Sequence, residues 1–450
     1  MRSATGGRAP SGRGTTRASW REVRRELAFE LVAVAGLVGV VLGAHEWGGR
    51  LYRRGENLFL AWPPLFATFQ RRWHLNLVGA TVYAAAVVAA GPLVARRMRW
   101  RWLLVTGWAA SLGWTVILAL SDGPLAHQLA RDDDYAAMIP FVRDHGLRAY
   151  FDLFHDRELL SSFPVHVRSH PAGMVTLFRL LDQIGLHGSG WRTALVLAGG
   201  ALVVPAVLVA AKQVFGESST RTVAPFLVLL PSAVWFGTTP DGFFAGVVAA
   251  SIAMFAVGCK RGSNLAFAVA GIVAGLAVSL TYGAIPLLAC TAVAGVLWKR
   301  RLAGMGAWLG GFALVVLAWW AAGFDLVQGF SAVRAQYDID IGQQARPYSY
   351  FVWSNLVVVA LALGPAVLVA FVRLRGRYWL ALAPVLVALV LADLSGLAKG
   401  EVERIWLLFY PWLTLATFAF VGLRVGGRRV HLAFQAGTAI VIQFLFLGPW

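Results

Sequence analysis

Charged residues are scarce in this 450-residue chain. They make up 14% of it, against roughly a quarter of an average soluble domain, whereas hydrophobic residues make up 58%. Apolar runs recur from end to end at close to the length of about twenty residues that a helix needs to cross a bilayer. This composition excludes an ordinary soluble enzyme and indicates a membrane protein.

Cysteine and lysine are also rare. The two cysteines, Cys259 and Cys290, lie at or within apolar runs, which excludes a disulfide framework and a cysteine-based metal site. The formal net charge is +18, and only four of the 40 basic residues are lysines. The basic residues gather in short turns between apolar runs, so we attribute the charge to membrane topology and expect no nucleic-acid partner.

The pattern predicts an all-α polytopic membrane protein with about 13 transmembrane helices, within a range of about 11 to 14. Residues 1–25 are expected to form a disordered, basic cytoplasmic tail, and residues 26–450 a single transmembrane domain with a retained first helix. The spans are expected near residues 27–45, 76–95, 102–120, 191–211, 222–237, 241–259, 264–281, 284–298, 303–323, 351–371, 379–394, 405–423 and 431–448.

The basic turns set the expected orientation. With a cytoplasmic N-terminus and alternating spans, the basic clusters at 96–99, 260–261, 299–301 and 428–429 all fall on the inner side. The polar loops, 121–190 and 324–350, then face outward. We therefore expect a multi-pass protein of the plasma (inner) membrane whose active face is extracytoplasmic.

The 121–190 loop is the most polar part of the chain. It holds nine of the 22 acidic residues and six of the 9 histidines. Apolar residues spaced as on one helix face run from Tyr135 to Val142 and from Met174 to Leu181, which predicts two interfacial helices joined by a polar crossing.

Three carboxylates, Asp132, Asp133 and Asp134, begin the first of these helices. One carboxylate is enough to cap a helix, and three in a row repel each other. The alternatives are a solvated, capped helix start, a general base for an acceptor hydroxyl, and a divalent cation bound by Asp132 and Asp134.

A basic group, His166, Arg168 and His170, precedes the second helix. Arg168 is a planar donor and His170 lies at a helix start, which favours a phosphate or pyrophosphate contact. The alternatives are a cap with solvated neighbours, and a metal bound by His155, His166 and His170, although their spacing matches no standard zinc signature.

A second group of charges lies near the C-terminus. Lys399, Glu401, Glu403 and Arg404 precede an apolar run, more charges than interfacial anchoring requires. We expect Lys399 and Arg404 to contact a lipid-linked phosphate. Further candidate substrate-binding residues on the same outer side are His166, Asp241, Tyr282, Tyr348, Glu401 and Glu403.

The layout resembles the GT-C superfamily of integral-membrane glycosyltransferases, in the style of the protein O-mannosyltransferase and aminoarabinose-transferase branch. Residues 132–135 through Gly146 resemble that family's acidic motif and interfacial helix, and 170–173 resemble its His-Pro-Pro-Gly motif, with Ala172 for the second proline. The stretches 231–241 and 404–411 also look similar. The acidic loop follows the third expected span, whereas the family usually has it after the first.

The resemblance implies an inverting transfer from a polyprenyl-phosphate-linked sugar to an extracytoplasmic glycan, lipid or protein. One aspartate of the 132–134 run would be the base, and Arg168, Lys399 and Arg404 would stabilise the leaving lipid phosphate. No cofactor beyond a divalent cation is implied.

Two other classes remain open, a lipid-linked-sugar flippase or other transporter and a non-catalytic envelope-assembly membrane protein. A transporter usually has ionisable groups inside its spans. We expect none near the middle of a span here.

Overall fold

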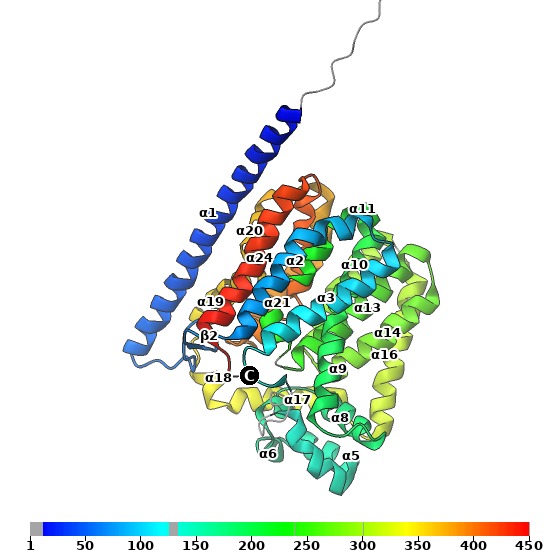
Figure 1. The fold of residues 1–450 in the computed structure, drawn as a ribbon. Helices are drawn as coiled ribbons and strands as arrows, with labels where there is room; N and C mark the ends of the chain where they lie inside the picture. The colour runs from blue at the N-terminus through cyan, green and yellow to red at the C-terminus, as the bar shows by residue number, and fades with distance from the viewer. Residues whose placement is uncertain (1–11, 126–133, 238, 300, 450) are drawn as a thin grey trace, which may run out of the picture.

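The computed structural model describes residues 12–125, 134–237, 239–299 and 301–449, and within them the chain is almost entirely helical (Figure 1). Asp132 and Asp133 therefore lie outside the described residues. The one sheet among those residues pairs two short antiparallel strands, β1 (Thr68–Phe69) and β2 (Phe446–Leu447).

Seven helical segments are long and apolar enough to cross a membrane, which confirms a multi-pass membrane protein. They are Trp20–Arg53 within α1 (Gly12–Arg53), α2 (Leu75–Arg97), α3 (Trp100–Ala119), the joined α9 (Ser189–Ala201) and α10 (Val203–Phe215), α13 (Asp241–Arg261), α16 (Leu302–Ala322), and Gly376–Leu394, which combines η2 (Gly376–Tyr378) with α21 (Trp379–Leu394).

An eighth span is formed if α19 (Tyr348–Leu363) and α20 (Pro365–Arg373) are taken together, although they bend by 100°. Two shorter apolar helices, α14 (Asn264–Leu280) and α15 (Ala284–Lys299), accompany them. The final long helix, α24 (Val425–Leu445), is not among these spans and carries Arg428 and Arg429 in its first turn.

The predicted count of about 13 full-length spans is higher than the seven or eight that helix length supports. Two expected spans are broken into short pieces: 222–237 into α11 (Glu217–Val228) and α12 (Ala233–Phe236), and 405–423 into α22 (Val402–Ile405), α23 (Tyr410–Leu413) and η3 (Thr414–Phe420). Pro231 lies at the first break, and Pro411 lies in the first turn of α23, just after the second break; neither can donate a backbone hydrogen bond.

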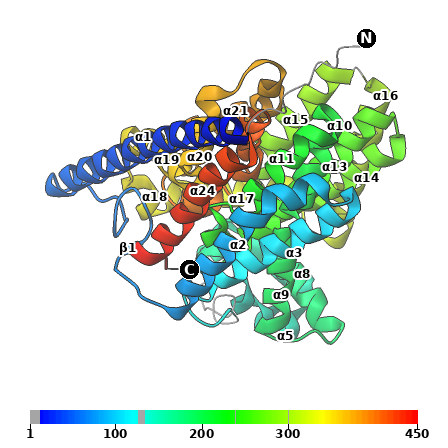
Figure 2. The same cartoon turned by 45° about the horizontal axis from the view of Figure 1, so that its top comes forward.

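The helices pack closely around α13, which contacts α9, α10, α14 and α15, while α16 lies on the far side of α14 (Figure 2). Glycine permits close crossings: a Cβ on Gly246 of α13 would lie 1.9 Å from the carbonyl oxygen of Gly199 in α9. Such small-residue contacts are typical of helix packing in lipid.

The first helix begins at Gly12, inside the 1–25 stretch for which the sequence predicts a disordered tail. Its Glu26 and Glu30 are fully buried, and the imidazole of His431 in α24 bridges their carboxylates. Arg373, at the end of α20, also pairs with Glu26. This ionic network lies near the basic end of the helices and not near their middle, and it ties α1 to the bundle.

The turns between helices divide between two ends of the molecule. Arg221 donates to the carbonyl oxygens of Ala95 and Met98, and Arg424 pairs with Glu22, so several basic turns share one end. The 134–190 segment and α17 (Leu326–Ile339) and α18 (Ile341–Ala345) lie at the other, lower in Figure 1. The polar segments therefore converge on the end opposite these basic turns.

The polar segment folds into short helices. These are η1 (Tyr135–Met138), α5 (Ile139–His155), α6 (Arg157–Leu160), α7 (Val165–Arg168) and α8 (Gly173–Gln183). Both predicted apolar stripes are present, and Tyr135, Val142, Met174 and Phe178 are buried in one cluster. Gly173 lets α8 approach α14, since a Cβ there would lie 2.1 Å from the carbonyl oxygen of Ser279.

Candidate active site

A buried ion pair joins two segments that are far apart in the sequence. The guanidinium of Arg404 donates to the Asp241 carboxylate at 2.9 Å and to Glu401 at 3.1 Å. Arg404 and Glu401 share a face because they are three residues apart around the single turn of α22, and Asp241 begins α13. Arg404 and Asp241 are 5% and 6% exposed, so removing either would leave a buried charge without its main partner.

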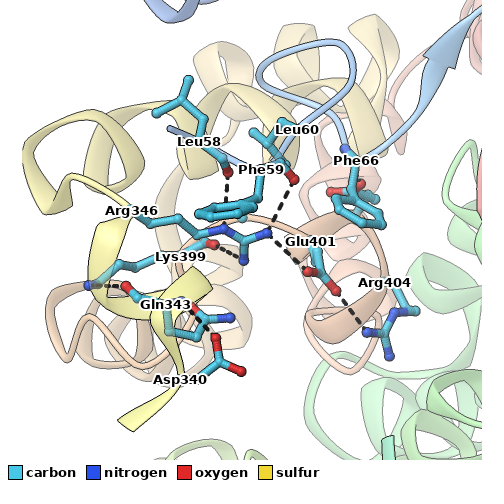
Figure 3. A network of polar contacts seen from close by, with 12 residues as sticks. Leu58, Phe59, Leu60, Phe66, Asp340, Gln343, Arg346, Lys399, Glu401 and Arg404 are labelled. Carbon is cyan, nitrogen blue, oxygen red and sulfur yellow. Dashed lines mark hydrogen bonds and ion pairs between the residues drawn. The ribbon is translucent and has the colours of Figure 1, made fainter. Parts of the chain in front are cut away.

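Arg346 connects this pair to the other polar segments (Figure 3). Its guanidinium donates to the Glu401 carboxylate at 3.3 Å and to the carbonyl oxygens of Leu58 at 3.1 Å, Phe59 at 3.5 Å and Lys399 at 2.7 Å. Phe59 and Glu401 are the two non-glycine residues with positive φ in the described chain, at 52° and 61°. Such strained backbone persists only where surrounding contacts hold it, and it clusters at functional sites.

Lys399 and Arg168 are the two further basic residues of this end of the molecule. The Lys399 ammonium donates to the carbonyl oxygen of Gln343 at 2.8 Å (Figure 3). Arg168 lies 3.5 Å from an oxygen of Asp340 and donates to the carbonyl oxygen of Ser161. No ion pair between Lys399 and a carboxylate is found among the described residues. Burial, and secondly the like charge of Arg346, lower the pKa of Lys399.

Asp134 is 3% exposed at the start of η1. One of its oxygens accepts from the Tyr135 backbone N–H at 2.6 Å and lies 3.8 Å from Nδ1 of His166. Asp134 therefore caps this helix, and the same carboxylate also faces the imidazole of His166. Asp132 and Asp133, whose placement is outside the described residues, directly precede it.

Tyr135 links Asp134 to the basic group. Its ring stacks on His166 with centroids 6.2 Å apart and meets His170 edge-on at 6.0 Å. Burial away from water lowers the pKa of His170 to about 4, so the imidazole is neutral at pH 7. The expectation that His170 supports phosphate binding would then have to rest on a neutral hydrogen bond and not on charge.

Glu403 faces away from Arg404 on the short helix α22. It is 1% exposed, and one oxygen accepts from the Phe66 backbone N–H at 2.8 Å. Burial raises the pKa of Glu403 to about 7, well above that of a solvated carboxyl. A carboxyl group with this pKa exchanges its proton near neutral pH.

The two tyrosines predicted to bind substrate, Tyr282 and Tyr348, make their hydrogen bonds outside this cluster. The hydroxyl of Tyr282 donates to the carbonyl oxygen of Leu326 at 2.9 Å, and burial raises its pKa. Tyr348 is exposed, and its hydroxyl donates to the carbonyl oxygen of Leu394 at 3.0 Å. Both side chains hold neighbouring segments together, and neither contacts the ion pairs described above.

The predicted residues that come together are thus Asp134 with His166, and Asp241 with Arg404 and Glu401, while Lys399 joins them through Arg346. Arg346 is a residue of this cluster that the sequence analysis did not single out. A useful signal was its position, a lone arginine before Pro347 in a loop with few other cations.

Metal binding receives no support from the described side chains. Within the described ranges, no group of three or more His, Cys, Asp or Glu side chains is arranged to hold an ion. His155 stacks on Phe324 and lies 3.2 Å from the carbonyl oxygen of Asp325. The expected pair of cation ligands, Asp132 and Asp134, includes one residue outside the described chain.

No protein-family model and no curated protein matches this sequence. Among solved structures, it is similar to the crystal structure of the Archaeoglobus fulgidus oligosaccharyltransferase in complex with Zn and sulfate, at 16% identity and a TM-score of 0.47. The match covers 77% of this chain and 54% of that one, so the chain spans about half of its length. A likeness this distant assigns neither residues nor activity.

Proposed function

We propose that this protein is a membrane glycosyltransferase of the GT-C type that moves a sugar from a polyprenyl-phosphate donor to an extracytoplasmic acceptor, with inversion. The observation that carries the proposal is the buried, mixed-charge cluster at one end of an apolar helical bundle, where Asp134, Asp241, Arg346, Lys399 and Arg404 gather from separate segments. An isoprenoid tail suits the apolar bundle, and a phosphate suits the polar end.

Lys399 is the principal candidate for the donor phosphate. Its ammonium donates to a neutral carbonyl oxygen and lies 6.0 Å from the ring centroid of Tyr337, so no carboxylate of the described chain neutralises its charge. Arg404, by contrast, is held by Asp241 and Glu401, which favours a positioning role over direct phosphate binding. Arg168 is only loosely paired with Asp340, at 3.5 Å, and is the second candidate for the phosphate.

The base is a carboxylate of the 132–134 run. It takes the proton of the acceptor hydroxyl as the oxygen attacks the anomeric carbon, and the bond from that carbon to the phosphate oxygen breaks. The electron pair leaves with the lipid phosphate, whose growing negative charge Lys399 and Arg168 stabilise. A single displacement of this kind inverts the anomeric centre.

The cluster is proposed to face the extracytoplasmic side of the plasma (inner) membrane. The basic turns at the opposite end support this orientation, because cytoplasmic loops carry an excess of arginine and lysine. The N-terminus, which precedes the first span, would then be cytoplasmic.

A transporter of lipid-linked sugars is the second candidate. The buried Glu26, Glu30, Arg373 and His431 network favours it, since ionisable groups within spans are costly and often functional. The network lies near the basic end and ties α1 in place, so we rank transport below catalysis.

The test is a transfer assay with purified protein, radiolabelled polyprenyl-phosphate sugars and a crude envelope fraction as acceptor. Asp132→Asn, Asp133→Asn and Asp134→Asn are compared with Asp144→Asn, a matched change at an exposed position of α5. Transfer that one of the first three abolishes supports the proposal. Lipid binding without turnover in the wild type would instead favour transport.

A further inference from the structure

A small cavity lies beside α22, on a different face from Arg404. In an α-helix, neighbouring residues point about 100° apart, so Glu403 points away from Arg404. Glu403 lines this cavity together with Asp122, Gln443, Trp235 and the apolar residues Leu65 and Ile442. Its inner space is of the size that a water molecule or a hydroxyl group fills.

The orientation of the Gln443 amide is fixed by its neighbour. Its nitrogen donates to Asp122 at 2.7 Å, and a carboxylate only accepts, so the amide oxygen must face elsewhere. Asp122 is itself paired with Arg72, and both of its oxygens are thereby engaged. The Gln443 oxygen is buried and has no partner among the described residues.

Glu403 presents a second acceptor of the same kind. One oxygen accepts from the Phe66 N–H, and the other is buried without a partner in the described chain. Buried polar atoms are nearly always hydrogen-bonded, so two such oxygens on one cavity wall point to a ligand. The Gln443 oxygen can only accept, so the ligand must donate at least one hydrogen bond.

We propose that this cavity is a subsite for a neutral hydroxyl-bearing group, held by Glu403 and Gln443 as hydrogen-bond acceptors. The proposal rests on the proposed function and assigns the site to the acceptor, which would enter beside the donor phosphate. The indole of Trp235 lines the same cavity and makes the wall beside the bound hydroxyl group apolar.

A cationic ligand is the principal competing chemistry. Arg72 already compensates Asp122, and burial raises the pKa of Glu403 to about 7. The site therefore lacks the full negative charge that a buried ammonium would need. A hydroxyl group can donate to the ionised carboxylate and can also accept from the protonated one.

The test measures equilibrium binding of tritiated hexyl β-D-glucoside to the full-length protein in nanodiscs. In Glu403→Gln, the amide oxygen must accept from Phe66, so an N–H donor replaces the free acceptor. Gln443→Leu removes the other acceptor. We expect each change to weaken saturable binding about tenfold, the effect of losing roughly one well-placed hydrogen bond.

Gln435→Leu is the matched control, because Gln435 is buried in the same helix and does not line the cavity. It should bind the probe as the wild type does. The inference is overturned if the wild type shows no saturable binding, if all three variants lose it equally, or if hexylammonium binds better than the glucoside. Polyprenyl-phosphate binding, measured on the same samples, tests the proposed function separately.

Discussion

At the scale of single residues, Lys399 is the cation of the cluster that pairs with no carboxylate of the described chain, since its ammonium contacts a carbonyl oxygen and the ring of Tyr337. We expect Lys399→Met to weaken binding of radiolabelled polyprenyl phosphate about tenfold or more, because a charge-assisted hydrogen bond contributes roughly 1.5–3 kcal/mol. The control is Lys260→Met, because Lys260 is exposed and lies at the basic end of the molecule. Equal affinity in the two variants would remove Lys399 from the donor site.

Asp134 tests catalysis against helix capping. Asparagine also caps helices, so Asp134→Asn should keep thermal stability close to that of the wild type. If Asp134 is the base, transfer falls about 10²–10⁴-fold, the usual contribution of general base catalysis. Thermal unfolding and transfer rates are measured on the same samples. Full activity in this variant would move the base to Asp132 or Asp133.

Glu403 should make stability depend on pH. Its pKa is about 7 in the fold and 4.5 in the reference state, so the unfolded chain releases the proton first. The free energy of unfolding therefore falls as pH rises from about 4.5 to about 7, by up to about 3 kcal/mol. Relative to the wild type, Glu403→Gln should gain thermal stability at pH 8 and little at pH 5. A gain that does not change with pH would show that Glu403 ionises normally.

At the scale of elements, the start of α13 is joined to α22 by the Arg404–Asp241 pair. Arg404→Met or Asp241→Asn alone should cost about 3–5 kcal/mol, because each leaves one charge buried without compensation. The double variant should recover part of that loss, which a thermal double-mutant cycle measures. Additive losses would mean that the two side chains do not depend on each other.

The elements also show how far sequence alone reaches. The helices near residues 135–142 and 174–181 were predictable because their apolar stripes repeat at helical spacing. The breaks of α11 and of α22–α23 were not, since hydrophobicity alone does not distinguish a continuous span from several buried short helices. Prolines at 231 and 411 were the available signal.

Which residues belong to the candidate site was easier to predict from the sequence than which of them contact each other. The acidic run and Arg404 stand out as polar residues in an apolar chain, but the partners of Arg404 and Arg346 depend on packing between distant segments. The Glu26–His431 network was missed for the same reason, because each residue alone reads as the end of a span.

At the scale of the whole molecule, the two ends of the bundle should face opposite compartments. We expect Ser162→Cys, in the polar segment, to react with a membrane-impermeant maleimide added outside intact cells. Arg375→Cys, exposed at the other end, should react only after the cells are opened. The reverse labelling pattern would place the candidate site in the cytoplasm.

Release of polyprenyl phosphate in a single turnover tests the central claim most directly, because it requires no knowledge of the natural acceptor beyond a crude envelope fraction. Excess protein in nanodiscs is mixed with donor labelled in both the sugar and the lipid, and both products are followed. The account predicts that lipid phosphate and sugar transfer appear together and that both are lost in the Asp132, Asp133, Asp134 triple asparagine variant. Donor that stays intact with the wild type, although it binds, would contradict the account.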